Sequence, residues 1–125
     1  MKILIVEDSM FVQNMTRKIV QERVPNCEIA TASSGDKGYE LYNEFKPDLV
    51  LTDLLMPGMS GQELLAKIRE TDKTTRVIVI SADVQKATRD DVEALGIEGF
   101  ISKPLSGEKA DLLIQLIGEA AHVPE

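Results

Sequence analysis

Positive charge is scarce in this sequence. Its 125 residues include 14 Lys and Arg against 21 Asp and Glu, which gives a formal net charge of −7 at pH 7 and a pI near 4.7. Nucleic acids and anionic membranes are bound by basic surfaces. The shortage of basic residues therefore excludes both as main partners, and the excess of acids favours the binding of cations.

Cysteine and long hydrophobic runs are scarce too. The one cysteine, Cys27, has no partner for an internal disulfide, and the alternating apolar stretch 27–32 around it predicts a small, buried side chain. The first apolar run, "ILIV", is followed directly by Glu7 and Asp8 and is too short for a signal peptide or a membrane span. We therefore expect a cytoplasmic protein.

What the sequence does contain is a series of short runs rich in Ile, Val and Leu. Each run predicts a β-strand, and the runs cover 3–6, 27–32, 49–52, 77–80 and 99–102. Segments with helical spacing of apolar residues lie between and after them, the weakest being 84–95. Strict alternation of this kind implies a parallel sheet with helices on both faces. We predict one three-layer α/β domain over 1–122, with five strands, five helices and a frayed tail at 123–125.

Polar and charged residues follow four of these strands. Glu7 and Asp8 come after the first, Asp53 after the third, Ser81 after the fourth and Lys103 after the fifth. Ligands of open parallel sheets bind outside the carboxyl ends of the strands. We therefore expect these side chains to meet at one edge of the sheet.

The chemistry of this set points to phosphoryl transfer. Three converging acids would repel one another and raise one another's pKa unless a cation neutralised them, and Mg²⁺ prefers such oxygen ligands. Lys103 and Ser81 are suited to holding an incoming anion. A carboxylate beside Mg²⁺, faced by these two groups, can accept a phosphoryl group, and Asp53 is the candidate because it ends the central strand.

Each of these residues also has an ordinary structural interpretation. Asp8 or Ser9 could cap the following helix, which for Asp8 taken alone is the commoner role. Asp53 could be an acid that opens a loop, and Ser or Lys at a strand end is usually a solvated turn residue. The functional interpretation depends on all of these residues falling at strand ends together.

The motifs "ILIVEDS", "DLVLTDLLMPGMSG", "VIVISA" and "GFISKPL" occur in this order along the chain. With them the sequence resembles the receiver domain of two-component response regulators over nearly its whole length, and in particular the stand-alone, chemotaxis-type receivers. The resemblance implies a flavodoxin-like, doubly wound sheet of strand order 2-1-3-4-5. It also implies that Asp53 accepts a phosphoryl group from a histidine kinase or a phosphotransfer protein.

The same resemblance assigns the metal site. It implies Mg²⁺ held by Asp8, Asp53 and the main-chain carbonyl of Leu55. Glu7 would act through water, and it stands where the family more often has Asp.

The resemblance further implies a conformational switch. Ser81 and Lys103 would contact the phosphoryl oxygens, and Phe100 would be the switch aromatic, at a position where many members have Tyr. A downstream protein would then read the face formed by helix 84–95, strand 99–102 and the last helix. We expect a monomer that signals through this contact, with chemotaxis as the expected pathway, or alternatively a phosphorelay intermediate or phosphate sink.

Two rivals of another class share parts of this pattern. A haloacid dehalogenase-like phosphatase also uses a nucleophilic Asp with Mg²⁺, but it has a second acid two residues later, where this sequence has Leu55. A mononucleotide binder would need a Gly-rich first loop, whereas this one reads "EDSMF". The sequence therefore favours a phosphoacceptor signalling domain over an enzyme.

Overall fold

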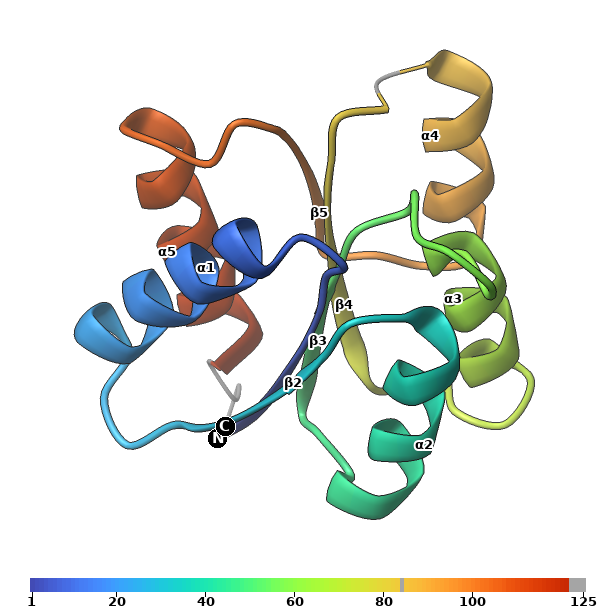
Figure 1. Ribbon diagram of the computed structural model, residues 1–125, viewed down its shortest axis with the longest axis horizontal. Helices are drawn as coiled ribbons and strands as arrows, with labels where there is room; N and C mark the ends of the chain where they lie inside the picture. Colours follow the sequence, from blue (N-terminus) through green and yellow to red (C-terminus); the bar gives the residue numbers. More distant parts are fainter. Residues whose placement is uncertain (84, 122–125) are drawn as a thin grey trace.

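The computed structural model describes residues 1–83 and 85–121 (Figure 1). Val84 and the predicted tail at 123–125 lie outside these residues. The strands are β1 (Lys2–Val6), β2 (Glu28–Ala32), β3 (Leu49–Thr52), β4 (Arg76–Ser81) and β5 (Gly99–Ser102). The helices are α1 (Met10–Arg23), α2 (Gly35–Phe45), α3 (Gly61–Arg69), α4 (Lys86–Ala94) and α5 (Glu108–Ala121).

The five strands form one parallel sheet of order β2-β1-β3-β4-β5, which confirms the predicted topology. The chain starts at β1, winds outward to β2, and then returns through β3 to β4 and β5. The order therefore reverses between β1 and β3, which are neighbours at the centre. This reversal places the loops after β1 and β3 side by side, where open α/β sheets bind ligands.

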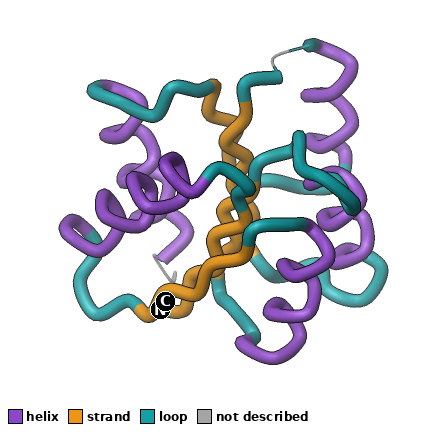
Figure 2. The backbone as a smooth tube through the Cα atoms, in the orientation of Figure 1, coloured by secondary structure: helices purple, strands orange, loops and turns teal. Residues whose placement is uncertain are grey.

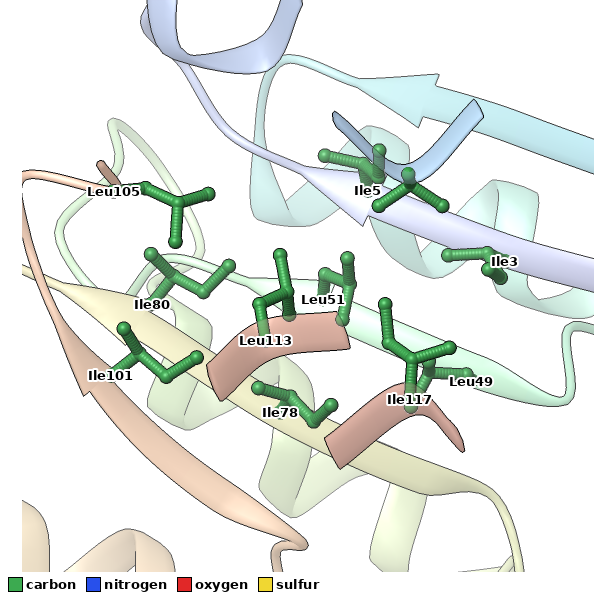
Figure 3. Close-up of a cluster of buried hydrophobic side chains, with 11 residues drawn as sticks. Ile3, Ile5, Leu49, Leu51, Ile78, Ile80, Ile101, Leu105, Leu113 and Ile117 are labelled. Carbon is green, nitrogen blue, oxygen red and sulfur yellow. The ribbon is translucent and has the colours of Figure 1, made fainter. Parts of the chain in front are cut away.

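The sheet stands between two layers of helices, seen edge-on in Figures 1 and 2, with α1 and α5 on one side and α2, α3 and α4 on the other. Successive strand residues point to opposite faces, so each strand contributes to two cores. Ile3, Leu49 and Ile78 pack with Leu113 and Ile117 of α5 on the first side (Figure 3). The second core holds the alternate strand residues with the inward side chains of α3: Leu4, Val50, Val77, Leu64, Leu65 and Ile68.

The element ends agree with the local sequence signals, with small differences. Ser60 and Glu63 form the predicted capping box at the start of α3. The predicted helix 84–95 is shorter, because α4 covers Lys86–Ala94 and follows Gln85, whose side chain makes no capping hydrogen bond within the described residues. Cys27 precedes β2 and is half-buried against the core.

Among the described residues, no helix is long and apolar enough to cross a membrane.

Candidate functional site

The backbone at the carboxyl edge of the sheet is fixed by hydrogen bonds that continue one residue past the strands. The N–H of Asp53 donates to the carbonyl of Val6 (3.0 Å), and the N–H of Lys103 donates to the carbonyl of Ser81 (3.0 Å). The N–H of Glu7 donates in the same way to the carbonyl of Ala32 (2.9 Å). The residues that the sequence predicted to converge are therefore attached to rigid strand ends.

The three acids come together as predicted. Glu7, Asp8 and Asp53 each offer a carboxylate oxygen within 4.8 Å of the others. Glu7 and Asp53 are buried, whereas Asp8 is exposed at the mouth of the site. Hard carboxylate oxygens, one of them open to solvent, are a donor set that fits Mg²⁺.

Lys103 pairs directly with the two buried acids, which the sequence did not reveal. Its Nζ lies 2.7 Å from Glu7 Oε1 and 2.8 Å from Asp53 Oδ2. The Lys103 side chain is only 17% exposed, so this shared pair is largely shielded from water. Three carboxylates and one ammonium leave two negative charges in the cluster.

The pKa values of the pair reflect this shortage of cations. Burial lowers the pKa of Lys103, but hydrogen bonds to Asp53 and Glu7 outweigh burial, and the pKa is raised above its ordinary value. Burial raises the pKa of Glu7, and the nearby charge of Asp53 raises it further. Lys103 and the Ser9 N–H lower the pKa, but by less, so the pKa of Glu7 is raised above its ordinary value. One lysine shared between two acids is thus held charged, while Glu7 is left short of positive partners.

The second oxygen of Asp53 is held by the backbone that follows it. Asp53 Oδ1 accepts from the N–H of Leu54 at 2.6 Å and lies 3.4 Å from that of Leu55. Gly61 at the start of α3 allows this tight return, because a Cβ there would lie 1.9 Å from the Asp53 carbonyl oxygen. The Asp53 carboxylate is therefore fixed from both sides before any ligand arrives.

Ser81 and Phe100 lie on the neighbouring strands. Ser81 is fully buried, and its Oγ accepts from the N–H of Asp83 at 3.1 Å. Phe100 is half-buried in the second core, with the guanidinium carbon of Arg89 on α4 5.3 Å from its ring centroid. The Phe100 ring thus lies between β5 and α4.

The capping interpretation of Asp8 is wrong. The N-cap of α1 is Ser9, whose side chain accepts from the N–H of Val12, and Ser9 in turn donates its own N–H to Glu7 Oε2 at 3.1 Å. Ser9 therefore begins the helix, and the exposed Asp8 carboxylate is left for another role.

Two further features of the site were not found from the sequence. Gln13 of α1 is buried and donates to the carbonyls of Glu7 (3.0 Å) and Ala32 (3.2 Å), which ties α1 to the ends of β1 and β2. Met10, Phe11 and Leu55 are large apolar side chains that are 56%, 76% and 62% exposed. These three follow the acids closely in sequence, and the exposure of Leu55 shows that it does not pack beneath its loop.

Comparison with known proteins gives one consistent family. The model of the response regulator receiver domain matches residues 3–116. The chain is 36% identical over 121 residues to the chemotaxis protein CheY of Listeria monocytogenes, covering 97% of this chain and 98% of that protein. It is 35% identical over 104 residues to the CheY of Halobacterium salinarum, covering 82% and 84% of the two chains.

Solved structures agree with these relatives. The CheX–CheY–BeF₃–Mg²⁺ complex from Borrelia burgdorferi contains a chain with a TM-score of 0.85 and 32% identity, covering 94% of this chain and 87% of that one. The N-terminal domain of a Wolinella succinogenes protein has a TM-score of 0.86 and 30% identity, with coverages of 96% and 93%. This chain belongs to the response regulator receiver domain family, and within it to the CheY-like receivers.

Proposed function

We propose that this chain accepts a phosphoryl group on Asp53 and signals through a change in its contacts with another protein. The observation that carries the proposal is the position of Asp53, which directly follows the central strand and is buried. Its Oδ2 lies 2.8 Å from Lys103 Nζ, and its Oδ1 accepts from the Leu54 N–H at 2.6 Å. Two further carboxylates, Glu7 and Asp8, lie beside it. A carboxylate can act as a nucleophile toward phosphorus, and among the described residues Lys103 is the one cation paired with Asp53.

Mg²⁺ is the metal that fits this acidic cluster. The cluster supplies Asp8 and Asp53 as ligands. From the family resemblance we add the main-chain carbonyl of Leu55 as a third ligand, with Glu7 acting through water. When bound, the ion would neutralise charge that develops on the phosphoryl oxygens.

The residues of the chain supply the other parts of the reaction. A carboxylate oxygen of Asp53 attacks phosphorus, the bond from phosphorus to the donor nitrogen breaks, and the donor imidazole keeps the electron pair. Lys103 moves from the carboxylate oxygen to the new phosphoryl oxygens, because the phosphoryl group carries about −1.5 to −2 charges where the carboxylate carried one. The Ser81 hydroxyl donates to the same oxygens.

The donor in this proposal is a histidine kinase or a phosphotransfer protein. Asp53 is buried, so a donor imidazole has to enter the site and the donor surface has to cover its rim. The exposed Met10 and Phe11 at the start of α1, with Leu55 in the loop after β3, provide apolar contacts there. Such contacts favour a protein donor over a nucleotide.

The output is a protein contact on the face formed by α4, β5 and α5. Phosphorylation draws Ser81 and Lys103 toward Asp53, which frees space behind Ser81 for the Phe100 ring and so changes this face. We propose a cytoplasmic, monomeric receiver, and the CheY relatives favour a role in chemotaxis. A phosphorelay intermediate or phosphate sink would use the same chemistry.

The haloacid dehalogenase alternative is not supported by the family match, and Leu55 offers no acid for turnover. We propose a signalling domain that accepts the phosphoryl group and releases it slowly, with no other substrate.

The test is intact mass after incubation with a small phosphodonor and Mg²⁺. The wild type should gain one acid-labile phosphoryl group, and Asp53→Asn should gain none. Asp48→Asn is the matched control, because Asp48 directly precedes the other end of the same strand and its side chain accepts only from the Lys2 N–H among the described residues. Full phosphorylation of Asp53→Asn, or none of the wild type, would contradict the proposal.

A further inference from the structure

The loop 54–60 between β3 and α3 carries the groups that hold Asp53. The N–H groups of Leu54 and Leu55 point to Asp53 Oδ1. The start of the loop, at Leu54, is tied to the first residue of α3. Gly61 donates its N–H to the Leu54 carbonyl at 2.9 Å, and the backbones are so close that Gly61 has no room for a Cβ. The geometry around Asp53 therefore depends on where this short loop is fixed.

The far end of the loop is fixed by α2. A Cβ on Gly35, the first residue of α2, would lie 2.1 Å from the Met59 carbonyl oxygen, so the two backbones are in direct contact. The neighbouring Asp36 uses its Oδ2 to accept the N–H of Met59 at 3.2 Å. Gly58 has a φ of +73°, and a Cβ there would lie 2.6 Å from the same Asp36 oxygen. The loop is thus shaped around the Asp36 carboxylate.

The start of α2 does not need Asp36 as its cap. Ser34 is the N-cap, and its hydroxyl accepts the N–H of Lys37 at 3.1 Å. An acid in the first turn also interacts favourably with the helix dipole, but that interaction would not require contact with another loop. The bond from Met59 to Asp36 therefore serves the loop rather than the helix.

We propose that Asp36 is a positioning residue for the phosphoacceptor site. It holds Met59, and through the five residues between Asp53 and Met59 it sets where the Leu54 and Leu55 N–H groups meet the Asp53 carboxylate. Without this bond the loop keeps its attachment at Gly61 and the packing of Met59, but it loses its hydrogen bond to α2, and the two donors are held less firmly toward Asp53. The inference rests on the proposed function in that Asp53 is the group being positioned.

The test compares Asp36→Ala, Asp36→Asn and Ser34→Ala. Ser34→Ala is the matched control, because it weakens the same helix end through its cap and Ser34 makes no hydrogen bond to the loop among the described residues. One readout is amide hydrogen exchange at Leu54 and Leu55, whose N–H groups donate to Asp53 and not to Asp36. The other is the rate of phosphorylation by a small phosphodonor at saturating Mg²⁺.

We expect Asp36→Ala to speed exchange at both amides and to slow phosphorylation by about tenfold, within the range that a small displacement near reacting groups produces. Asp36→Asn keeps an oxygen acceptor and should restore most of the slow amide exchange and most of the phosphorylation rate. Ser34→Ala should lower the melting temperature at least as much as Asp36→Ala while leaving exchange at both amides and the rate near wild-type values.

If Asp36→Ala behaves like Ser34→Ala in both readouts while the wild type is phosphorylated, the positioning role is wrong and the proposed function stands. If the wild type is not phosphorylated, the proposed function fails, and exchange at Leu54 and Leu55 still decides whether Asp36 holds the loop.

Discussion

The acids at the two edges of the sheet differ in how far hydrogen-bond donors and cations surround their carboxylates. At the amino edge, the Asp72 carboxylate accepts from Tyr42 Oη at 2.5 Å and from both the backbone and the hydroxyl groups of Thr74 and Thr75. At the carboxyl edge, Glu7 and Asp53 share one lysine, and Asp8 stands exposed beside them. The same fold therefore satisfies one acid completely and leaves a cluster short of cations.

The pKa values express the same contrast. Burial alone would raise the pKa of Asp72, but its hydrogen bonds from Thr75, Tyr42 and the backbone outweigh burial, and the pKa lies well below its usual range. Burial and the bond to Asp72 raise the pKa of Tyr42 to about 12. For Glu7 the effect of burial exceeds that of its hydrogen bonds, and the pKa is raised. Asp72 has hydrogen-bond donors for both of its oxygens and stabilises the fold, whereas the three clustered acids carry more negative charge than Lys103 balances and are available to bind a cation.

Lys103→Met should have the largest effect, because it removes the only cation paired with the two buried acids in the described residues. Removing one partner of a buried ion pair costs about 3 kcal/mol or more of unfolding free energy. Urea denaturation at pH 7 measures the loss. Adding Glu7→Gln to this variant should recover part of it, and a double variant no more stable than Lys103→Met would show that the acids do not repel.

Asp72→Ala should have the second largest effect. It should lower the free energy of unfolding by about 2 kcal/mol at pH 7, since hydrogen bonds to a charged acceptor contribute about 1.5–3 kcal/mol. Because the folded pKa of Asp72 is depressed, its contribution is present above the ordinary pKa of the carboxyl group and is lost as the pH falls toward the folded value. Denaturation of the wild type and Asp72→Asn across pH 7 to 3 should therefore give converging stabilities. A constant difference would refute the role of the charge.

The third prediction concerns Mg²⁺ at the other edge. A ligand that binds only the folded state at about ten times its Kd stabilises it by about 1.4 kcal/mol. The melting temperature of the wild type should rise with Mg²⁺, and that of Asp8→Ala should rise less, while Asp8→Ala without metal is at least as stable as the wild type. Asp48→Asn is the control and should respond like the wild type, and an equal response of Asp8→Ala would remove Asp8 from the ligand set.

Glu7→Gln should have the smallest effect, below about 1 kcal/mol in unfolding free energy at pH 7. Its raised pKa means that the ionised form is disfavoured in the folded protein, so a neutral side chain of the same size replaces it with little loss. As the pH falls through the folded pKa, the wild type should gain stability relative to this variant. A loss as large as that of Lys103→Met would show that Glu7 is fully compensated after all.

The sequence was sufficient for the fold and for the placing of Glu7, Asp8, Asp53 and Lys103 at one edge of the sheet, because both follow from short-range patterns. The runs ending at Val6, Thr52 and Ile80 predict parallel strands, and the residues after them must share an edge. The capping box at Ser60 and Glu63 is a local signal of the same kind.

The missed contacts are long-range choices between partners. The sequence predicted that Lys103 binds an incoming anion, but in the structure its ammonium group already pairs with Asp53. The two residues are fifty positions apart in sequence. The same holds for Asp36 and Met59, which are twenty-three residues apart. Such pairings depend on side-chain reach and loop shape, which no spacing rule encodes.

The most direct test of the central claim is to locate the phosphoryl group. The protein is incubated with a small phosphodonor and Mg²⁺, reduced with borohydride to convert the acyl phosphate into a stable alcohol, and sequenced as peptides by mass spectrometry. The account predicts a single modification at Asp53, absent from Asp53→Asn. Modification at Glu7, at Asp8 or elsewhere in the chain, with Asp53 intact, would contradict it.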